Sequence, residues 1–327
     1  MATPVWTTNT LPGHFDGDFN KRYTTSIIKY LQSPNLLYRQ LGNIVDTKRP
    51  YWKGTITTLL GNWSEVAEGI QEAPPVRPEK VRDLQARVKL VKGVLVVSRE
   101  LLEDDKATGY NYVNALIPKF AERGIRALEL DFTNTFINNG FTYDPLRDLR
   151  DDQALYSTAH KAGNTSVTYG NTPATASALG EASLAQAIGY YWGGIYDDAG
   201  DLTPMLDVRE FILVVHPTKV IYAEQLVKSL SSTADYKNSG VINPLGAGNN
   251  FKIRVLAAPY QTSPTQWSLF PVTSSKEDGG LGILMRTAPG APERIDRQNP
   301  DQIQWQGRMR YGLMSLDPRW SYSNPGM

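Results

Sequence analysis

The hydrophobic positions of the chain change their period several times, which predicts strands and helices in mixed order. β-branched and aromatic residues dominate 51–60 and 88–97, so both segments are predicted to be strands. Residues 61–85, between them, contain three prolines and mixed charges, which predicts a solvent-facing hairpin tip. A two-stranded ribbon is only marginally stable alone in water. This projection therefore indicates an oligomer.

Helical spacing follows the second strand. Ser98 can cap a helix that begins with the acidic run RELLEDD. Residues 111–139 place apolar and small side chains three and four positions apart, with Leu128 on the face expected to be buried, and Gly140 is expected to end the helix. Pro118 interrupts this pattern, and we expect it to start a second, longer helix rather than to kink a single one.

The rest of the chain alternates between the two periods. Helices are predicted over 27–31, 36–41, 181–191 and 220–230, and strands over 211–215, 251–257, 266–272, 283–286 and 303–316. Residues 1–19 show neither period and are predicted to form an extended arm. The fold class is therefore α+β, with an elongated β arm.

Composition excludes several classes of protein. The net charge of +1 gives no electrostatic excess for binding nucleic acid, so DNA affinity is not expected to be the main task. The absence of cysteine removes disulfides and thiolate chemistry, which fits synthesis in a reducing cytoplasm. No segment has the ~18 consecutive apolar residues that cross a bilayer, and the first residues do not resemble a secretion signal. Neither a membrane nor secretion is expected.

Candidate chemistry is sparse, because the chain has only three histidines. Ser157, His160 and Asp152 superficially resemble a catalytic triad, but a triad is assembled across a fold rather than within one short loop. We therefore interpret His160 as a hydrogen-bonded loop histidine. Residues 144–152, DPLRDLRDD, are interpreted as a solvated or interfacial charge cluster.

No metal or cofactor is expected. Asp197, Asp198 and Asp201 lack the ligand spacing and the closing glutamate of an EF-hand, so they are interpreted as a solvated turn between a helix and a strand. Residues 240–248, GVINPLGAG, lack the lysine and hydroxyl of a phosphate-binding loop and the spacing of a dinucleotide fingerprint. None of these motifs therefore indicates an enzyme.

Several motifs in a fixed order carry a family resemblance. They are VVSRELLED at 96–104, RALELDFTNTFINNG at 126–140, ALYSTAH at 154–160, LGEASLAQA at 179–187 and FILVVHPTKVIYAEQLV at 211–227. Together they resemble the major head subunit of Mu-type bacteriophages over about 88–320. The resemblance implies the Hong Kong 97 phage-type capsid fold, in which many copies form hexamers and pentamers of an icosahedral head around double-stranded DNA.

The same resemblance implies a division of the chain. It assigns 1–46 to an N-terminal arm, 47–97 to an extended loop, 98–177 with 284–327 to a peripheral domain that contains a spine helix, and 178–283 to an axial domain. The implied partners are further copies of the chain, a portal, a possible decoration protein and packaged DNA held by non-specific contact. Some relatives carry a long helical propeptide that acts as a scaffold, and 1–46 contains none, so we expect either a separate scaffolding protein or a sequence that is already the mature form. The expected location is the virion, after synthesis in the bacterial cytoplasm.

Subunit contacts are expected from aromatic residues of the arm and loop and from charged residues of the loop and of 144–152. The candidates are Trp6, Phe15, Trp52, Trp63, Arg77, Lys80, Arg82, Asp148 and Asp151. Some relatives crosslink a loop lysine to a neighbour, but no motif singles out Lys80 for this, and an exposed lysine is a poor nucleophile. The alternative function is an encapsulin-like bacterial nanocompartment, which shares the fold but packages enzymes.

Overall fold

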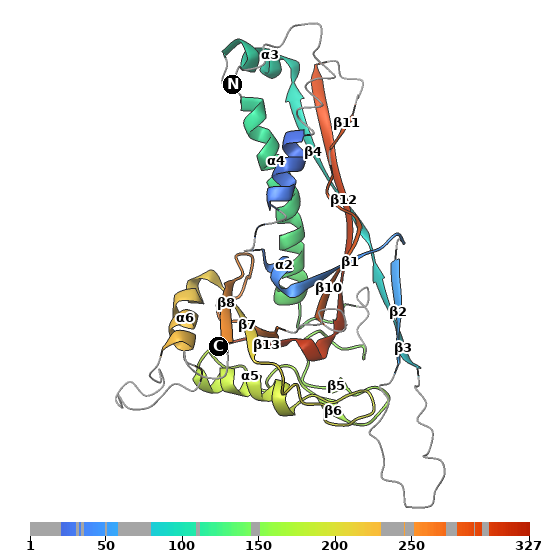
Figure 1. Ribbon diagram of the computed structural model, residues 1–327, viewed down its shortest axis with the longest axis vertical. Helices are drawn as coiled ribbons and strands as arrows, with labels where there is room; N and C mark the ends of the chain where they lie inside the picture. Colours follow the sequence, from blue (N-terminus) through green and yellow to red (C-terminus); the bar gives the residue numbers. More distant parts are fainter. Residues whose placement is uncertain are drawn as a thin grey trace, which may run out of the picture.

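The computed structural model describes residues 21–30, 33, 36–49, 51–57, 80–108, 112–144, 151–229, 245, 252–272, 280–290, 292–295 and 301–327. A long helix and a long ribbon of strands lie side by side in the elongated molecule, and a second sheet with two helices lies toward the other end (Figure 1). Residues 21–30 are helical, and α2 spans Leu37–Leu41, as the sequence predicted for 27–31 and 36–41. Residues 1–19, predicted to be an arm, lie outside the described residues.

The long sheet is organised around one strand, β12 (Gln302–Asp317). Its antiparallel neighbours are β4 (Lys89–Ser98), β10 (Gly280–Thr287) and β11 (Glu293–Ile295). β1 (Gly42–Asp46) adds to β10 in parallel. The strands predicted at 88–97, 283–286 and 303–316 are therefore confirmed, whereas β1 and β11 were not predicted.

The hairpin of the extended loop differs from the prediction. β2 (Tyr51–Thr57) pairs with β3 (Lys80–Arg87), and the strand at 88–97 pairs with β12 instead. The strand predicted at 51–60 is confirmed over 51–57, and 58–60 lie outside the described residues. The assignment of all of 61–85 to a hairpin tip was wrong, because 80–85 belong to β3. The sequence of β3, KVRDLQAR, is mostly polar and gives no apolar alternation that would have revealed the strand.

The spine of the molecule is a single helix. Ser98 Oγ accepts a hydrogen bond from the backbone N–H of Leu101 at 3.2 Å, which confirms the predicted cap of α3 (Arg99–Thr108). α4 (Tyr112–Thr133) then runs into the π-helical turn η1 (Asn134–Asn138). Pro118 lies inside α4, so the expectation that it starts a new helix was wrong.

Packing explains why the helix continues through the proline. Ile117 and Ala121, on either side of Pro118, are both fully buried in a cluster with Trp305 of β12. This burial offsets the lost backbone hydrogen bond. Gly140 follows η1, as predicted, and a Cβ atom there would lie 2.4 Å from the Tyr156 ring, so the position requires glycine for space.

The second sheet has the order β13 (Tyr322–Asn324), β9 (Trp267–Pro271), β7 (Glu210–Val215) and β8 (Lys252–Ala257), with β7 and β8 parallel. α5 (Glu181–Gly193) and α6 (Val220–Lys228) flank it (Figure 1). The remaining elements are β5 (His160–Lys161), β6 (Thr168–Tyr169), and the 3-10 turns η2 (Pro217–Lys219) and η3 (Pro318–Trp320). The predicted helices and strands of this region are confirmed.

One strand joins the two cores. β7 is a continuous apolar run, as expected for a strand that is buried on both faces. Ile212 and Val214 pack into the cluster that contains Leu128 of α4, whereas Phe211, Leu213 and Val215 pack against α5 and α6. The burial of Leu128 is as predicted. The spine helix and the second sheet therefore share a hydrophobic contact rather than a polar interface.

Candidate assembly surfaces and the junction of the two sheets

The predicted interface residues fall into three groups. Trp52 lies opposite Ala86, and Lys80 and Arg82 lie opposite Thr57 and Ile56, in the β2–β3 hairpin. Asp151 lies in the loop after α4. The others lie outside the described residues: Trp6, Phe15, Trp63, Arg77 and Asp148. The structure thus places three candidates together on the hairpin and one elsewhere, and their contacts with other subunits remain predictions.

Asp151 is buried in a network around His160. The His160 ring is fully buried, and its Nδ1 lies 2.7 Å from the Asp151 carboxylate. Its Nε2 lies 3.2 Å from the Leu155 carbonyl and 3.1 Å from the Asn171 amide oxygen. The Asn171 orientation is fixed because its Nδ2 donates to the carbonyls of Leu155 and Pro318. The network therefore ties the loop to the C-terminal segment.

This arrangement confirms that His160 is a hydrogen-bonded residue, although it lies in the short strand β5 and not in a loop. The histidine pairs with Asp151 rather than with Asp152, whose carboxylate accepts from the Tyr143 hydroxyl. The Ser157 hydroxyl bonds to Gln153 and to a backbone amide, so it is not aligned with the imidazole as a nucleophile.

Two of the three aspartates of the DDAGD turn are buried, so the prediction of a solvated turn was wrong for Asp197 and Asp198. Asp197 Oδ1 accepts from the backbone N–H groups of Ala199 and Asp201, both at 2.9 Å, and the side chain is buried. Asp198 is buried too, with its carboxylate 3.6 Å from the guanidinium of Arg319. Within the described ranges, no group of three or more metal-ligating side chains is present.

Arg319, which sequence reasoning missed, is the centre of a buried ionic network. Its Nε donates to both carboxylate oxygens of Asp317, at 2.9 and 2.8 Å, and its Nη2 donates to Asp317 Oδ2 at 2.6 Å. The other terminal nitrogen donates to the Tyr196 carbonyl at 3.1 Å. Asp317 also caps η3 by accepting from the Arg319 backbone N–H. The Asp-Pro pair at 317–318 is the sequence signal that could have indicated this cap.

The buried carboxylate of Glu129 fixes α2 on the spine helix. Glu129 of α4 accepts from the backbone N–H groups of Leu37 and Tyr38, at 2.6 and 3.2 Å. Burial raises the pKa of Glu129 above its usual value, although the two backbone hydrogen bonds act to lower it. Burial, with a contribution from this carboxylate, also raises the pKa of Tyr38 to about 12.

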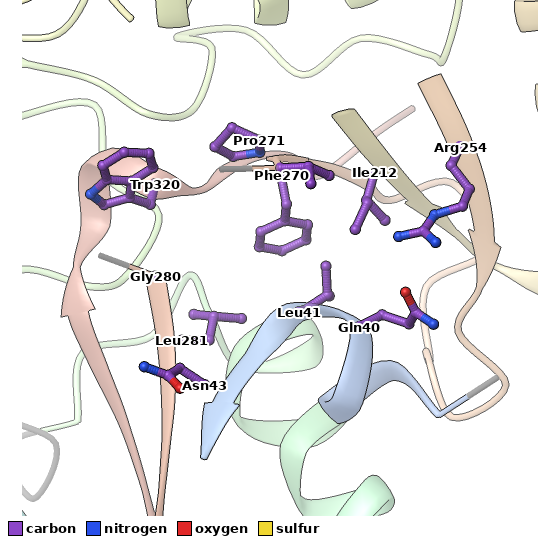
Figure 2. Close-up of a pocket in the computed structure, with 11 residues that line it drawn as sticks. Gln40, Leu41, Asn43, Ile212, Arg254, Phe270, Pro271, Gly280, Leu281 and Trp320 are labelled. Carbon is purple, nitrogen blue, oxygen red and sulfur yellow. The ribbon is translucent and has the colours of Figure 1, made fainter. Parts of the chain in front are cut away.

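The junction of the two sheets contains a small hollow (Figure 2), lined by apolar side chains and by the polar side chains of Gln40, Asn43 and Arg254. Figure 2 shows Phe270 of β9 pointing into it, with Ile212 of β7 beside the ring and Leu41 and Leu281 facing it from α2 and β10. The cavity has a volume of about 90 Å³. Its lining comes from both sheets, so any movement of one sheet against the other changes these contacts.

One face of β4 exposes three apolar side chains, with the exposed Lys92 between them. Leu90, Val94 and Val96, here called the β4 stripe, are each nearly half exposed, while Val97 and its alternating neighbours turn toward α4. Within the described residues β4 pairs only with β12, which leaves its other edge open. An open strand edge beside apolar side chains is a surface suited to contact with another chain.

Comparisons with known proteins match this architecture. A family model described as phage capsid protein matches residues 84–324. The capsid structure of cyanophage P-SCSP1u is similar, with a TM-score of 0.54 and 10% identity over 88% of this chain and 87% of that one. A chain of Mycobacterium phage Patience gives a TM-score of 0.51 with 11% identity, covering 98% and 94%.

A compartment protein also shares the fold. The holo-SrpI encapsulin complex from Synechococcus elongatus gives a TM-score of 0.50 with 10% identity, covering 99% of this chain and 92% of that one. No curated protein matches the chain. None of the described helices is long and apolar enough to span a membrane. The structural matches establish the Hong Kong 97-like fold that the family resemblance implied.

Proposed function

The chain belongs to the phage capsid protein family and has the structural role of a capsid subunit, and from this premise we propose that it is a Mu-type major head subunit. Copies associate into hexamers and pentamers, which close into an icosahedral virion shell around double-stranded DNA. The family match over 84–324 carries this proposal. The order of motifs between 96 and 227 supports the Mu-type assignment.

Self-association is supported by surfaces that the chain does not cover by itself. The β2–β3 hairpin pairs with no other sheet among the described strands, and a two-stranded ribbon is marginal alone. The β4 stripe lies on an open edge of the long sheet. A neighbouring copy would cover both features, and a contact repeated around symmetry axes multiplies a modest gain over the whole shell.

The chemistry of the described residues supports a role without catalysis. His160 is buried, and both of its ring nitrogens lie within hydrogen-bond distance of oxygen atoms of the protein. His216 caps its own turn, because its Nδ1 accepts from the Thr218 backbone N–H. Both histidines thus have structural partners, and neither converges with a nucleophile in a cavity.

We propose the domain assignment that the resemblance implied. The spine helix and strands β11 and β12 belong to the peripheral domain, from 98–177 and 284–327, and 178–283 form the axial domain around strands β7, β8 and β9. The segments 1–46 and 47–97 are the arm and the extended loop. Two strands link these units: β4 of the extended loop pairs with β12 of the peripheral domain, and β13 of the peripheral domain pairs with β9 of the axial domain.

The test is assembly of the purified chain. We expect sedimentation velocity to show a concentration-dependent equilibrium of monomers, capsomers and closed shells, which negative-stain microscopy would image. Replacing Val94 by Asp in the β4 stripe should reduce assembly, whereas Leu206→Asp, on a separate exposed loop, is the matched control. A monomer at every concentration would contradict the proposal.

The second candidate is an encapsulin-like shell, which the fold similarity to an encapsulin favours. Mass spectrometry of shells isolated from the native source separates the two functions. Particles with DNA, a portal and tail proteins support the phage head, and scaffolding or decoration proteins would identify its further partners. Particles that hold a single enzyme cargo would instead identify a compartment.

A further inference from the structure

A hollow at the start of β4 collects positive charge. It has a volume of about 490 Å³. Its charged lining residues are Arg87, Lys89, Arg286, Arg310, Asp131 and Asp144. Lys89 is neutralised because its Nζ lies 2.5 Å from the Asp131 carboxylate, and Asp144 has an interaction of its own. Among the described residues, the three arginines form no ion pair, so their charge is available to a ligand.

The strands bring these arginines together. Gly312 of β12 allows the chain to cross between β3 and β4, because a Cβ atom there would lie 2.7 Å from the Arg87 carbonyl oxygen. Arg310 lies opposite both Leu90 of β4 and Thr287 of β10, so the residues next to these positions converge on it. The hollow, here called the arginine hollow, is therefore built by backbone crossing rather than by flexible side chains alone.

A complementary acidic surface lies at the other end of β4. Glu100 and Glu103 of α3 are exposed and have no partner in the described part of the chain, and exposed Asp104 follows them. β4 has ten residues, which at about 3.3 Å per residue separates α3 from the arginine hollow by roughly 30 Å. Figure 1 shows α3 at the tip of the molecule and β4 running away from it.

We propose that the arginine hollow binds the carboxylates of α3 from a second copy of the chain. The two surfaces cannot meet within one rigid subunit, so their complementarity is satisfied only between copies. Such a contact is heterologous, and heterologous contacts close into rings when the rotation allows it. The planar guanidinium fork of arginine is suited to bidentate binding of carboxylates. The proposal rests on the proposed function, since it specifies one contact of the shell.

Charge exchange between the two surfaces tests the proposal. Arg310→Glu and Glu103→Arg should each raise the protein concentration needed for assembly at least about tenfold, equivalent to about 1.4 kcal/mol per subunit. The double variant should recover assembly to within about threefold of the wild type, because the pair is restored with opposite polarity. Glu103 is the fifth residue of α3, past the first turn, so its reversal spares the N-terminal cap.

Controls separate this contact from folding and from the proposed function. Lys161→Glu, which reverses an exposed charge on β5, should assemble like the wild type, and circular dichroism should be unchanged in all variants. If the wild type assembles and the double variant stays as impaired as the singles, the pairing is overturned. A phosphate site would appear as weaker binding of a DNA duplex by Arg310→Glu without rescue, and this also overturns it. Failure of the wild type to assemble would instead contradict the proposed function.

Discussion

Replacement of Arg319 by Ala tests how much its buried ion pairs with Asp317 and Asp198 contribute to the stability of the chain. The side chain is 10% exposed, and its charged partners Asp317 and Asp198 are 8% and 3% exposed. Removal of the guanidinium leaves these carboxylates in a poorly solvated site without their cation. Breaking a buried ion pair from one side typically costs about 3–5 kcal/mol, because the remaining charge is uncompensated. We expect a loss of this size.

Urea unfolding of the unassembled chain measures this loss. At a slope of roughly 3 kcal/mol/M, the midpoint should fall by about 1–2 M urea. Arg126→Ala is the matched control, because Arg126 forms an exposed pair with Glu122 one helical turn away and should cost only about 0.5 kcal/mol or less. Arg319→Lys should lie between them, since an ammonium keeps the charge but loses the bidentate geometry.

The reasoning is refuted if Arg319→Ala and Arg126→Ala lower the midpoint equally. That result would mean that water or a rearranged turn compensates Asp317 and Asp198 at little cost. Near-ultraviolet circular dichroism distinguishes the two cases, because Trp320 lies in the same turn and reports its rearrangement.

Three further outcomes follow from the packing. Leu128→Ala should lower the free energy of unfolding by about 2–5 kcal/mol through lost burial and a cavity, whereas Leu130→Ala, at a 41% exposed position, should cost far less in the same urea assay. Burial raises the pKa of Glu129 in the folded chain, so its stabilising contribution is fully present below about pH 4.5 and is lost as the pH rises through the folded-state pKa. The difference in unfolding free energy between the wild type and Glu129→Gln should therefore fall as the pH rises from about 4.5. A pH-independent difference would contradict this expectation. Replacing 58–79, which join β2 to β3, by a short turn should leave the thermal melt native-like but prevent stable shells in negative-stain microscopy, and closed shells of normal stability would refute the intermolecular role of this loop.

The elements that could be predicted from the sequence are those whose own residues form an apolar face. β7 was predictable because both of its faces are apolar, and α4 because one of its faces is. β3 was not, because its stability comes from pairing with β2 rather than from an apolar face of its own. Pro118 was misinterpreted because the burial of Ile117, which keeps the helix continuous, depends on β12, almost two hundred residues away.

The candidate sites also divide into residues that the local sequence indicates and residues that only the tertiary structure brings together. Aromatic and charged residues of the loop could be proposed from their type, but the Arg319 network could not, because its members come from the DDAGD turn and from the end of β12. The arginine hollow has the same origin, since Arg87, Arg286 and Arg310 are far apart in the chain and meet only where the strands cross. Local sequence indicates which side chains are charged, whereas the topology decides which of them are paired.

The segment 302–324 connects the long sheet to the second sheet. β12 pairs with β4, from a distant part of the chain, and with β10 and β11, which shortly precede it, and β13 completes the second sheet against β9. Between them, η3 carries Arg319 to the DDAGD turn, and Trp320 lines the hollow at the junction of the sheets. The long sheet cannot form before β12 is present, because β4 and β10 both pair with it. The pairing of β4 with β12 is non-local, and non-local pairing slows folding relative to local contacts. Until then β4 lacks its partner along its whole length, so the surfaces of β4 that are suited to assembly take their final form only when the C-terminal strands have been added.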